Sequence, residues 1–356
     1  MSQLLQLAPE EYEPGLPAIL AGSTTPVIRS RVDNFFSSIA SIFESWVGRR
    51  QSVHTQRAYR EDVMAFVKFM RLSWPDQAME LLCRSVQDVQ RFRAQLVAQN
   101  AAPKTLNRRI SSLSSFYKYL AAASAELRLP ITVPNPAHAQ FISRESTDPR
   151  EETRALSAAR ARQLLGLPAG NTILDYRDRA ILKFFLYSGA RLSTACRLKV
   201  SDFHQDGDEA TIRLHEKGDK RRTIGLNFQA AQAIAEYIEK AGLSSGPLFR
   251  PRLNSRSQKL AGSAMSSSTL WRAVAAYLKQ LPGSFKEDRQ SDGSTTSQSV
   301  FTPHSLRATT ATLLLDAGVD IVKVKELLGH RHITTTQIYD KRRRSTSESA
   351  SHLLAI

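Results

Sequence analysis

The last third of the sequence contains basic side chains and a tyrosine whose types and spacing suit chemistry on a phosphate. His304 and Arg307 lie three residues apart at the start of a predicted helix, which places both side chains on one face. His330 precedes Tyr339 by nine residues. The forked donors of a guanidinium match phosphate oxygens, and a tyrosine hydroxyl can act as a covalent nucleophile. These residues indicate phosphate transfer.

Phosphate transfer without a metal also needs further cationic donors and an acid that protonates the leaving oxygen. Arg191 follows Gly189 at a predicted helix end, and Lys217 lies in a predicted turn between two strands. Lys220 could replace Lys217 as the acid if the hairpin had another register. Taken singly, each such residue is more often structural or solvent-exposed. Together they predict a metal-independent active site, which comprises Arg191, Lys217, His304, Arg307, His330 and Tyr339.

Four segments containing these residues resemble, in order, the motifs of the tyrosine recombinases and integrases, a family that includes Xer recombinases, phage integrases and Cre. The segments are YSGARLSTACRL, HEKGDKRRTIGL, TPHSLRATTATLLLDAG and LGHRHITTTQIY. The earlier segments SVHTQRAYREDVMAFVKFM and KTLNRRISSLSSFYKYL are similar to the family's DNA core-binding domain. The resemblance therefore extends over roughly residues 30 to 341.

The resemblance implies that Tyr339 attacks the scissile phosphate and forms a 3'-phosphotyrosyl link with a free 5'-hydroxyl. The covalent bond would conserve the phosphodiester energy, so no nucleotide cofactor is expected. No metal is expected either, because cationic side chains would surround the phosphate. His330 would bond a phosphate oxygen. A second nearby histidine, His332, is more simply a residue of the loop before the last helix.

The resemblance also implies roles for the other residues. Arg191 and Arg307 would clamp the phosphate, and His304 would assist proton transfer to or from the nucleophile. Lys217 would protonate the leaving 5'-oxygen, and it fits the family's Lys-Gly turn better than Lys220 does.

The sequence departs from the family pattern at Thr194. The family commonly has an acidic residue three positions after the first arginine, whereas Thr194 is uncharged. The support that this carboxylate gives the site must be absent or supplied elsewhere. We expect cleavage to survive.

Charge and composition favour a DNA partner. The 356 residues include 49 Lys plus Arg against 33 Asp plus Glu, a formal net charge of +16, which suits a polyanion better than a merely basic solvated surface. Hydrophobic residues at 42% can form a core, and the length suits two domains. Cys83 and Cys196 support neither a disulfide framework nor a metal site. No apolar run is long enough for a membrane span, so we expect a soluble cytoplasmic protein.

The chain divides into five predicted segments by composition and periodicity. These are a flexible leader (1–30), a helical core DNA-binding domain (31–128), an extended linker (129–157), a catalytic domain (158–341) and a tail (342–356). The catalytic domain is predicted to be helical with two strands around the Lys217 turn, and its polar segment 282–300 to be a surface loop. The expected fold is mainly α with a small β-sheet, a two-domain DNA clamp of the DNA breaking-rejoining type.

A helix predicted after Pro103 carries the candidate DNA contacts of the first domain. Its basic face could simply be solvated, but the basic chain favours DNA contact. The candidates are Lys104, Thr105, Arg108 and Arg109.

The expected function is a site-specific recombinase that binds two double-stranded DNA sites as a homotetramer and exchanges strands through a Holliday junction. A type IB topoisomerase, which has a similar active site but relaxes supercoils, is one alternative. A non-catalytic DNA-binding protein of the same fold is another. The resemblance further suggests that the tail docks on a neighbouring subunit.

Overall fold

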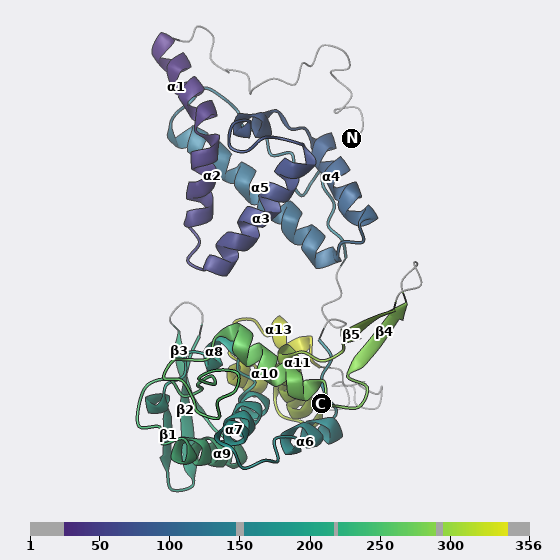
Figure 1. The fold of residues 1–356 in the computed structure, drawn as a ribbon. Helices are drawn as coiled ribbons and strands as arrows, with labels where there is room; N and C mark the ends of the chain where they lie inside the picture. Colours follow the sequence, from purple (N-terminus) through teal and green to yellow (C-terminus); the bar gives the residue numbers. More distant parts are fainter. Residues whose placement is uncertain (1–24, 147–152, 217–219, 290–294, 341–356) are drawn as a thin grey trace, which may run out of the picture. The chain divides into compact units, whose positions relative to one another are not determined.

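The computed structural model describes residues 25–146, 153–216, 220–289 and 295–340. The chain forms two compact units, Met1–Thr147 and Asp148–Ile356 (Figure 1). Helices make up most of the described residues, accompanied by a three-stranded and a two-stranded antiparallel sheet. The predicted fold class, mainly helical with a small sheet, is confirmed. No helix of the described residues has the length and apolar character needed to cross a membrane.

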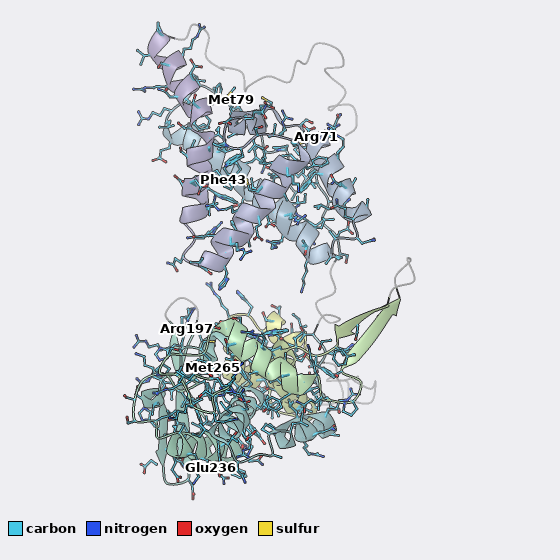
Figure 2. The ribbon with its side chains drawn as sticks, viewed as in Figure 1. Phe43, Arg71, Met79, Arg197, Glu236 and Met265 are labelled. Carbon is cyan, nitrogen blue, oxygen red and sulfur yellow. The ribbon has the colours of Figure 1, made fainter. Side chains whose placement is uncertain are left out.

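The first unit is helical and packs around a cluster of aromatic rings. Phe43, labelled in Figure 2, meets Phe116 edge to face at a centroid distance of 5.4 Å. Trp46 is fully buried and stacks on Tyr59 at 5.1 Å. These contacts fix the helices to one another, since aromatic pairs add to the free energy of burial. The elements are α1 (Pro26–Ser37), α2 (Ile39–Gly48), α3 (Val53–Phe69), η2 (Ala78–Cys83), α4 (Val86–Ala98) and α5 (Pro103–Glu126).

The ends of this unit differ from the expected leader and linker. Helix α1 begins at Pro26 after the N-cap Thr25, inside the segment expected to be a loose leader, whose residues 1–24 lie outside the described part. Residues 129–146, expected in an extended linker, bury Leu129, Ile131 and Ile142 in the helical core. Their apolar residues follow neither a helical nor a strand period, so only tertiary packing reveals them.

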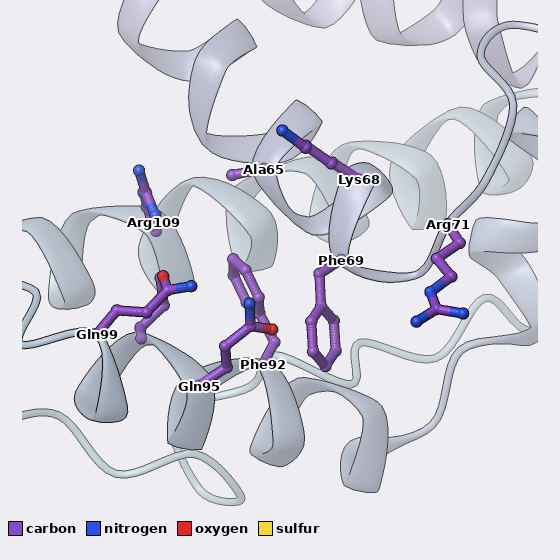
Figure 3. Close-up of a pocket in the computed structure, with 9 residues that line it drawn as sticks. Ala65, Lys68, Phe69, Arg71, Phe92, Gln95, Gln99 and Arg109 are labelled. Carbon is purple, nitrogen blue, oxygen red and sulfur yellow. The ribbon is translucent and has the colours of Figure 1, made fainter.

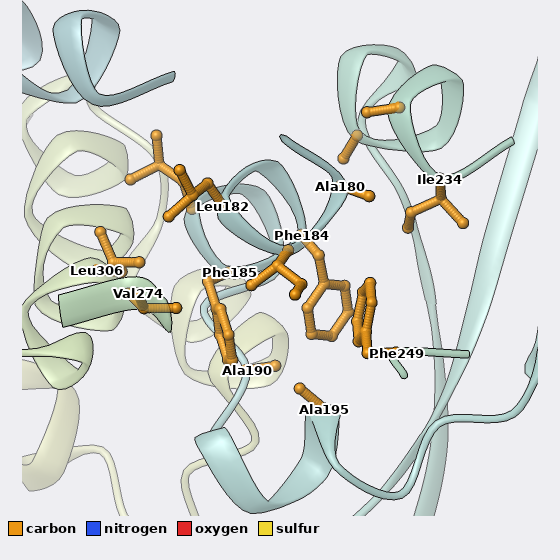
Figure 4. Packing of buried hydrophobic residues seen from close by; sticks show 14 of the residues in the cluster. Ala180, Leu182, Phe184, Phe185, Ala190, Ala195, Ile234, Phe249, Val274 and Leu306 are labelled. Carbon is orange, nitrogen blue, oxygen red and sulfur yellow. The ribbon is translucent and has the colours of Figure 1, made fainter. Parts of the chain in front are cut away.

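The second unit is built around α7, which lies at the centre of its hydrophobic core (Figure 4). Phe184 and Phe185 of α7 are buried there, and Phe249 packs against Phe184 at a centroid distance of 5.8 Å. The helical elements are α6 (Ala158–Gly166), α7 (Ile173–Ser188), α8 (Leu192–Ala195), η3 (Val200–Asp202), α9 (Phe228–Lys240), α10 (Ser267–Leu278), α11 (Pro303–Asp316), α12 (Ile321–Leu328) and α13 (Thr334–Gln337). The strands are β1 (Phe203–Asp206), β2 (Glu209–His215), β3 (Arg221–Gly225), β4 (Phe285–Arg289) and β5 (Thr295–Ser299).

The sheets agree with the prediction in one place and differ in another. Strands β2 and β3 form the predicted hairpin, paired from Thr211↔Gly225 to His215↔Arg221, and β1 adds a third strand. The segment 282–300, predicted to be a loop, instead contains the paired strands β4 and β5. That prediction was wrong because these strands are mostly polar and lack the apolar alternation that signals a strand.

Candidate active site

The first arginine follows a tight helix end. Helix α7 ends at Gly189, which has a φ of +58° in the left-handed region that glycine adopts most easily. A Cβ at Gly189 would lie 2.4 Å from Cδ2 of Leu328, so the turn packs closely against the end of α12. Arg191 then serves as the N-cap residue of α8, with its side chain 42% exposed. The turn thus presents a partly exposed guanidinium beside α12.

Arg307 ties three motifs together from inside the protein. It lies in α11 and is only 2% exposed. Its Nη1 donates to the Gly189 carbonyl at 2.6 Å, and its Nη2 donates to the Leu328 carbonyl at 2.7 Å. These bonds satisfy backbone oxygens at the ends of α7 and α12. A guanidinium has five N–H donors, so three more can serve other partners.

His330 and Tyr339 lie face to face after α12. Gly329, with a φ of +66°, ends α12 and turns the chain into His330. His330 is 8% exposed, and its Nδ1 shares a hydrogen bond of 2.8 Å with Oγ1 of Thr336. Tyr339 follows α13, and its ring stacks on the His330 ring at a centroid distance of 6.2 Å. The tyrosine also packs on a small apolar cluster that includes Leu328, which fixes its ring.

The electrostatics of the site favour an anion. Burial, and next the charge of Arg191, lower the pKa of Arg307 to about 10, while Tyr339 acts in the opposite direction. Burial, followed by the charges of Arg307 and Arg191, lowers the pKa of His330 to about 3. His330 is therefore neutral near pH 7, and the positive charge belongs to the guanidinium groups.

The structure brings five of the six predicted residues into one region. His304 is exposed in the first turn of α11, and it is among the groups near His330 that lower the pKa of that histidine. Lys217 lies outside the described residues. Lys220 is described and exposed, and its carbonyl accepts the backbone N–H of Glu216 at 2.7 Å. The five residues linked by ring stacking or by electrostatic influence are Arg191, His304, Arg307, His330 and Tyr339.

Two residues of this region were missed by the sequence interpretation. Oε1 of Glu216 lies 3.3 Å from Nη1 of Arg191 and 3.3 Å from Nη2 of Arg222. The Arg222 side chain reaches α12, where its Nη1 donates to the Glu326 carbonyl at 3.3 Å. Both residues flank the predicted lysine turn, but their spacing gives no signal that distinguishes them from the other charged residues of the hairpin. Thr194 is 2% exposed in α8.

Metal-ligand groups form no cluster among the described residues. No three or more His, Cys, Asp or Glu side chains lie together there as they would around a metal ion. The arginines and histidines above are donors suited to phosphate oxygens.

The candidate DNA contacts of the first unit lie in the first turns of α5, and a buried carboxylate binds one of them and lies close to another. Nη1 of Arg108 donates to Oδ2 of Asp62 at 2.8 Å, and Nε of Arg109 lies 4.0 Å from Oδ1. Asp62 is 1% exposed, and burial raises its pKa. Lys104 is exposed and Thr105 half-buried. Asp62 thus orients Arg108, whereas Arg109 lies near the carboxylate without a hydrogen bond from its Nε.

A pocket beside α5 extends this basic surface to α3. It has a volume of about 510 Å³, and its lining combines the rings of Phe69 and Phe92 with the cations Lys68, Arg71 and Arg109 (Figure 3). The basic groups therefore come from α3, from α5 and from Arg71, two residues after the end of α3.

The low pKa of His330 predicts a loss of stability in acid. The unfolded chain takes up this proton near the ordinary pKa of 6.5, whereas the folded protein takes it up only near 3. Protonation thus favours unfolding, and the free energy of unfolding should fall between these pH values by up to about 1.4 kcal/mol per pH unit. Urea unfolding from pH 7 to pH 4 measures it. His330→Gln should reduce this dependence, whereas His332→Gln, at an exposed histidine, should retain it.

Comparisons with known proteins match both units of the chain. Residues 154–345 match the phage integrase family, and residues 44–124 match the N-terminal SAM-like domain of phage integrases. The chain is 31% identical to tyrosine recombinase XerC of Pelobacter propionicus, over 82% of this chain and 85% of the relative. It is 32% identical to tyrosine recombinase XerD of Listeria innocua, over 81% and 88%.

Solved structures share the fold at low sequence identity. The XerH site-specific recombinase bound to difH substrate has a TM-score of 0.65 and 18% identity, covering 95% of this chain and 99% of that one. A lambda integrase dimer bound to a COC' core site has a TM-score of 0.59 and 16% identity, covering 91% and 84%.

Proposed function

The chain belongs to the phage integrase family of tyrosine recombinases, and we propose that it cuts and rejoins specific DNA sites through a covalent bond to Tyr339. The observation that carries this assignment is the Tyr339 ring stacked on His330 beside the buried Arg307. The site then combines a nucleophile, Tyr339, with a neutral hydrogen-bonding group, His330, and a fixed cation, Arg307.

The proposed reaction exchanges one phosphodiester for another. The Tyr339 oxygen attacks phosphorus, the bond from phosphorus to the 5'-oxygen breaks, and a 3'-phosphotyrosyl bond forms. Lys217 gives the leaving 5'-oxygen its proton, and His304 assists the proton's departure from the tyrosine. A 5'-hydroxyl from the partner duplex then attacks the phosphotyrosyl bond and releases Tyr339. Because the bond energy is conserved, the cycle needs no nucleotide.

The remaining residues stabilise charge on the phosphate. Arg191 supplies a partly exposed guanidinium. Arg307 supplies the N–H donors that are not used in its hydrogen bonds to the Gly189 and Leu328 carbonyls. If Nδ1 of the neutral His330 accepts the Thr336 hydroxyl, its Nε2 carries the N–H and can donate to a phosphate oxygen. The buried positions of Arg307 and His330 make their donors stronger than they would be in water.

DNA binding would use both units. We assign phosphate contacts in the first unit to Lys104, Thr105, Arg108 and Arg109, and the net charge of +16 supports a polyanionic partner. Two double-stranded sites, each bound by two subunits, would form a homotetramer that exchanges strands through a Holliday junction.

The test is strand exchange between two labelled duplexes. Genomic DNA fragments that remain covalently attached after denaturation provide the site by sequencing. With EDTA present and ATP absent, two duplexes carrying that site should yield recombinant strands. Relaxation of any supercoiled plasmid without exchange would instead support the topoisomerase alternative. The absence of any covalent adduct would support a non-catalytic DNA-binding protein.

Removing a phosphate contact should change the salt dependence of DNA binding. Lys104→Ala should weaken binding to specific and unrelated duplexes alike, and should reduce the slope of log K against log salt by about 1. Fluorescence anisotropy between 50 and 300 mM salt, roughly a sixfold range, measures this slope. Lys240→Ala removes the charge of another exposed lysine, in α9 of the second unit, and should leave the slope unchanged. An unaltered slope for Lys104→Ala would remove this residue from the interface.

A further inference from the structure

We propose that Glu216 is a positioning residue that holds the guanidinium groups of Arg191 and Arg222 in place for the phosphate. The inference rests on the proposed function, because it concerns the same site. One carboxylate oxygen of Glu216 lies 3.3 Å from a terminal nitrogen of each arginine. The Glu216 side chain is 11% exposed, so water competes little for these contacts.

Glu216 also contacts the segment that leads to the nucleophile. A Cβ built on Gly329 would lie 2.8 Å from Oε2 of Glu216 and 2.9 Å from Nε of Arg222. The carboxylate therefore packs directly against the backbone next to His330. The side chain joins the end of strand β2, the start of α8 and the end of α12, which carry separate parts of the site.

The Glu216 carboxylate offsets part of the positive charge of the site. Arg191 and Arg222 both lower the pKa of Arg307, whereas Glu216 raises it. Three guanidinium groups close together repel one another before DNA arrives, and one carboxylate offsets part of that repulsion. Thr194 in α8 is uncharged, so the carboxylate that supports Arg191 comes from the hairpin.

The geometry of the Glu216 contact leaves Arg191 able to bind a phosphate. At 3.3 Å the Glu216 contact engages one terminal nitrogen of Arg191, and the guanidinium has four further N–H donors for a phosphate. Arg191 is 42% exposed, and a long exposed side chain without a partner samples many rotamers. Holding it beforehand lowers the entropic cost of forming the transition state.

The test compares cleavage with binding in Glu216→Gln, which keeps the shape and removes the charge. The rate of covalent complex formation at saturating DNA should fall about tenfold, while DNA affinity stays the same or increases because a negative charge is lost near the phosphate. Glu209→Gln, the same change at an exposed position of β2, should alter neither. Glu216→Asp should recover part of the rate.

A second readout does not need catalysis. In an NMR spectrum, the Nε–H signal of Arg191 can be identified by its loss in Arg191→Lys. Its chemical shift should differ from those of arginines without an ion pair, and should move toward them in Glu216→Gln. If the wild-type protein cleaves no DNA, the proposed function fails, and this signal still decides the role of Glu216. An unchanged rate with an unmoved signal overturns the positioning role. A faster rate also overturns it, because the carboxylate would then compete with the phosphate.

Discussion

Replacing Tyr339 with phenylalanine should abolish covalent attachment to DNA and leave DNA affinity and folding unchanged. The ring would keep its stacking on His330 and its contacts with the apolar cluster, so only the hydroxyl is lost. Removing the nucleophile of an active site commonly costs a factor of about a thousand or more. A suicide substrate, nicked near the cleavage site so that the 5'-hydroxyl diffuses away, traps the adduct on a denaturing gel.

Tyr187→Phe provides the matched control for this experiment. Tyr187 lies in the same unit and donates its hydroxyl to Gln229 at 2.8 Å, so the change also removes one hydroxyl from a half-buried tyrosine. This variant should form the adduct at the wild-type rate. Adduct formation by Tyr339→Phe would show that another residue attacks the DNA.

Arg307→Ala should strongly reduce the rate of cleavage and also lower the free energy of unfolding. The variant leaves the carbonyls of Gly189 and Leu328 without their buried donor, at a cost of about 1–3 kcal/mol for each. Loss of a donor to the transition state reduces the rate by a further factor of about 100 to 1000. Urea unfolding and suicide-substrate trapping below the unfolding midpoint measure the two effects.

Arg191→Ala separates the two roles of the arginines. Arg191 is partly exposed and forms an ion pair with Glu216, so Arg191→Ala should reduce cleavage about as much as Arg307→Ala does. It should change the free energy of unfolding by less than about 1 kcal/mol. Arg213→Ala, at an exposed position of β2, should affect neither quantity. Equal stability losses in Arg191→Ala and Arg307→Ala would contradict the structural role assigned to Arg307.

The positions of most candidate residues next to helix ends could be predicted from the sequence, because local signals mark those ends. Gly189 ends a helix two residues before Arg191, and Gly329 ends one directly before His330. The three-residue spacing of His304 and Arg307 reflects one helical turn. Such patterns depend on neighbours in the chain, so one sequence is sufficient.

The supporting contacts could not be predicted, because they join segments far apart in the sequence. Glu216 and Arg222 belong to a hairpin, yet they meet Arg191 and the end of α12. The bond of Arg108 to Asp62 similarly joins α5 to α3. In each case the residue type is visible in the sequence, whereas its partner depends on tertiary packing. The burial of residues 129–146 was missed for the same reason.

The central claim is that Tyr339 becomes joined to a DNA 3'-phosphate. Mass spectrometry of the peptide that remains on DNA after proteolysis of a trapped complex tests it most directly. We predict a single modified peptide that contains Tyr339, linked to a 3'-phosphate with a free 5'-hydroxyl on the other fragment. Attachment through any other residue, or to a 5'-phosphate, would contradict the account.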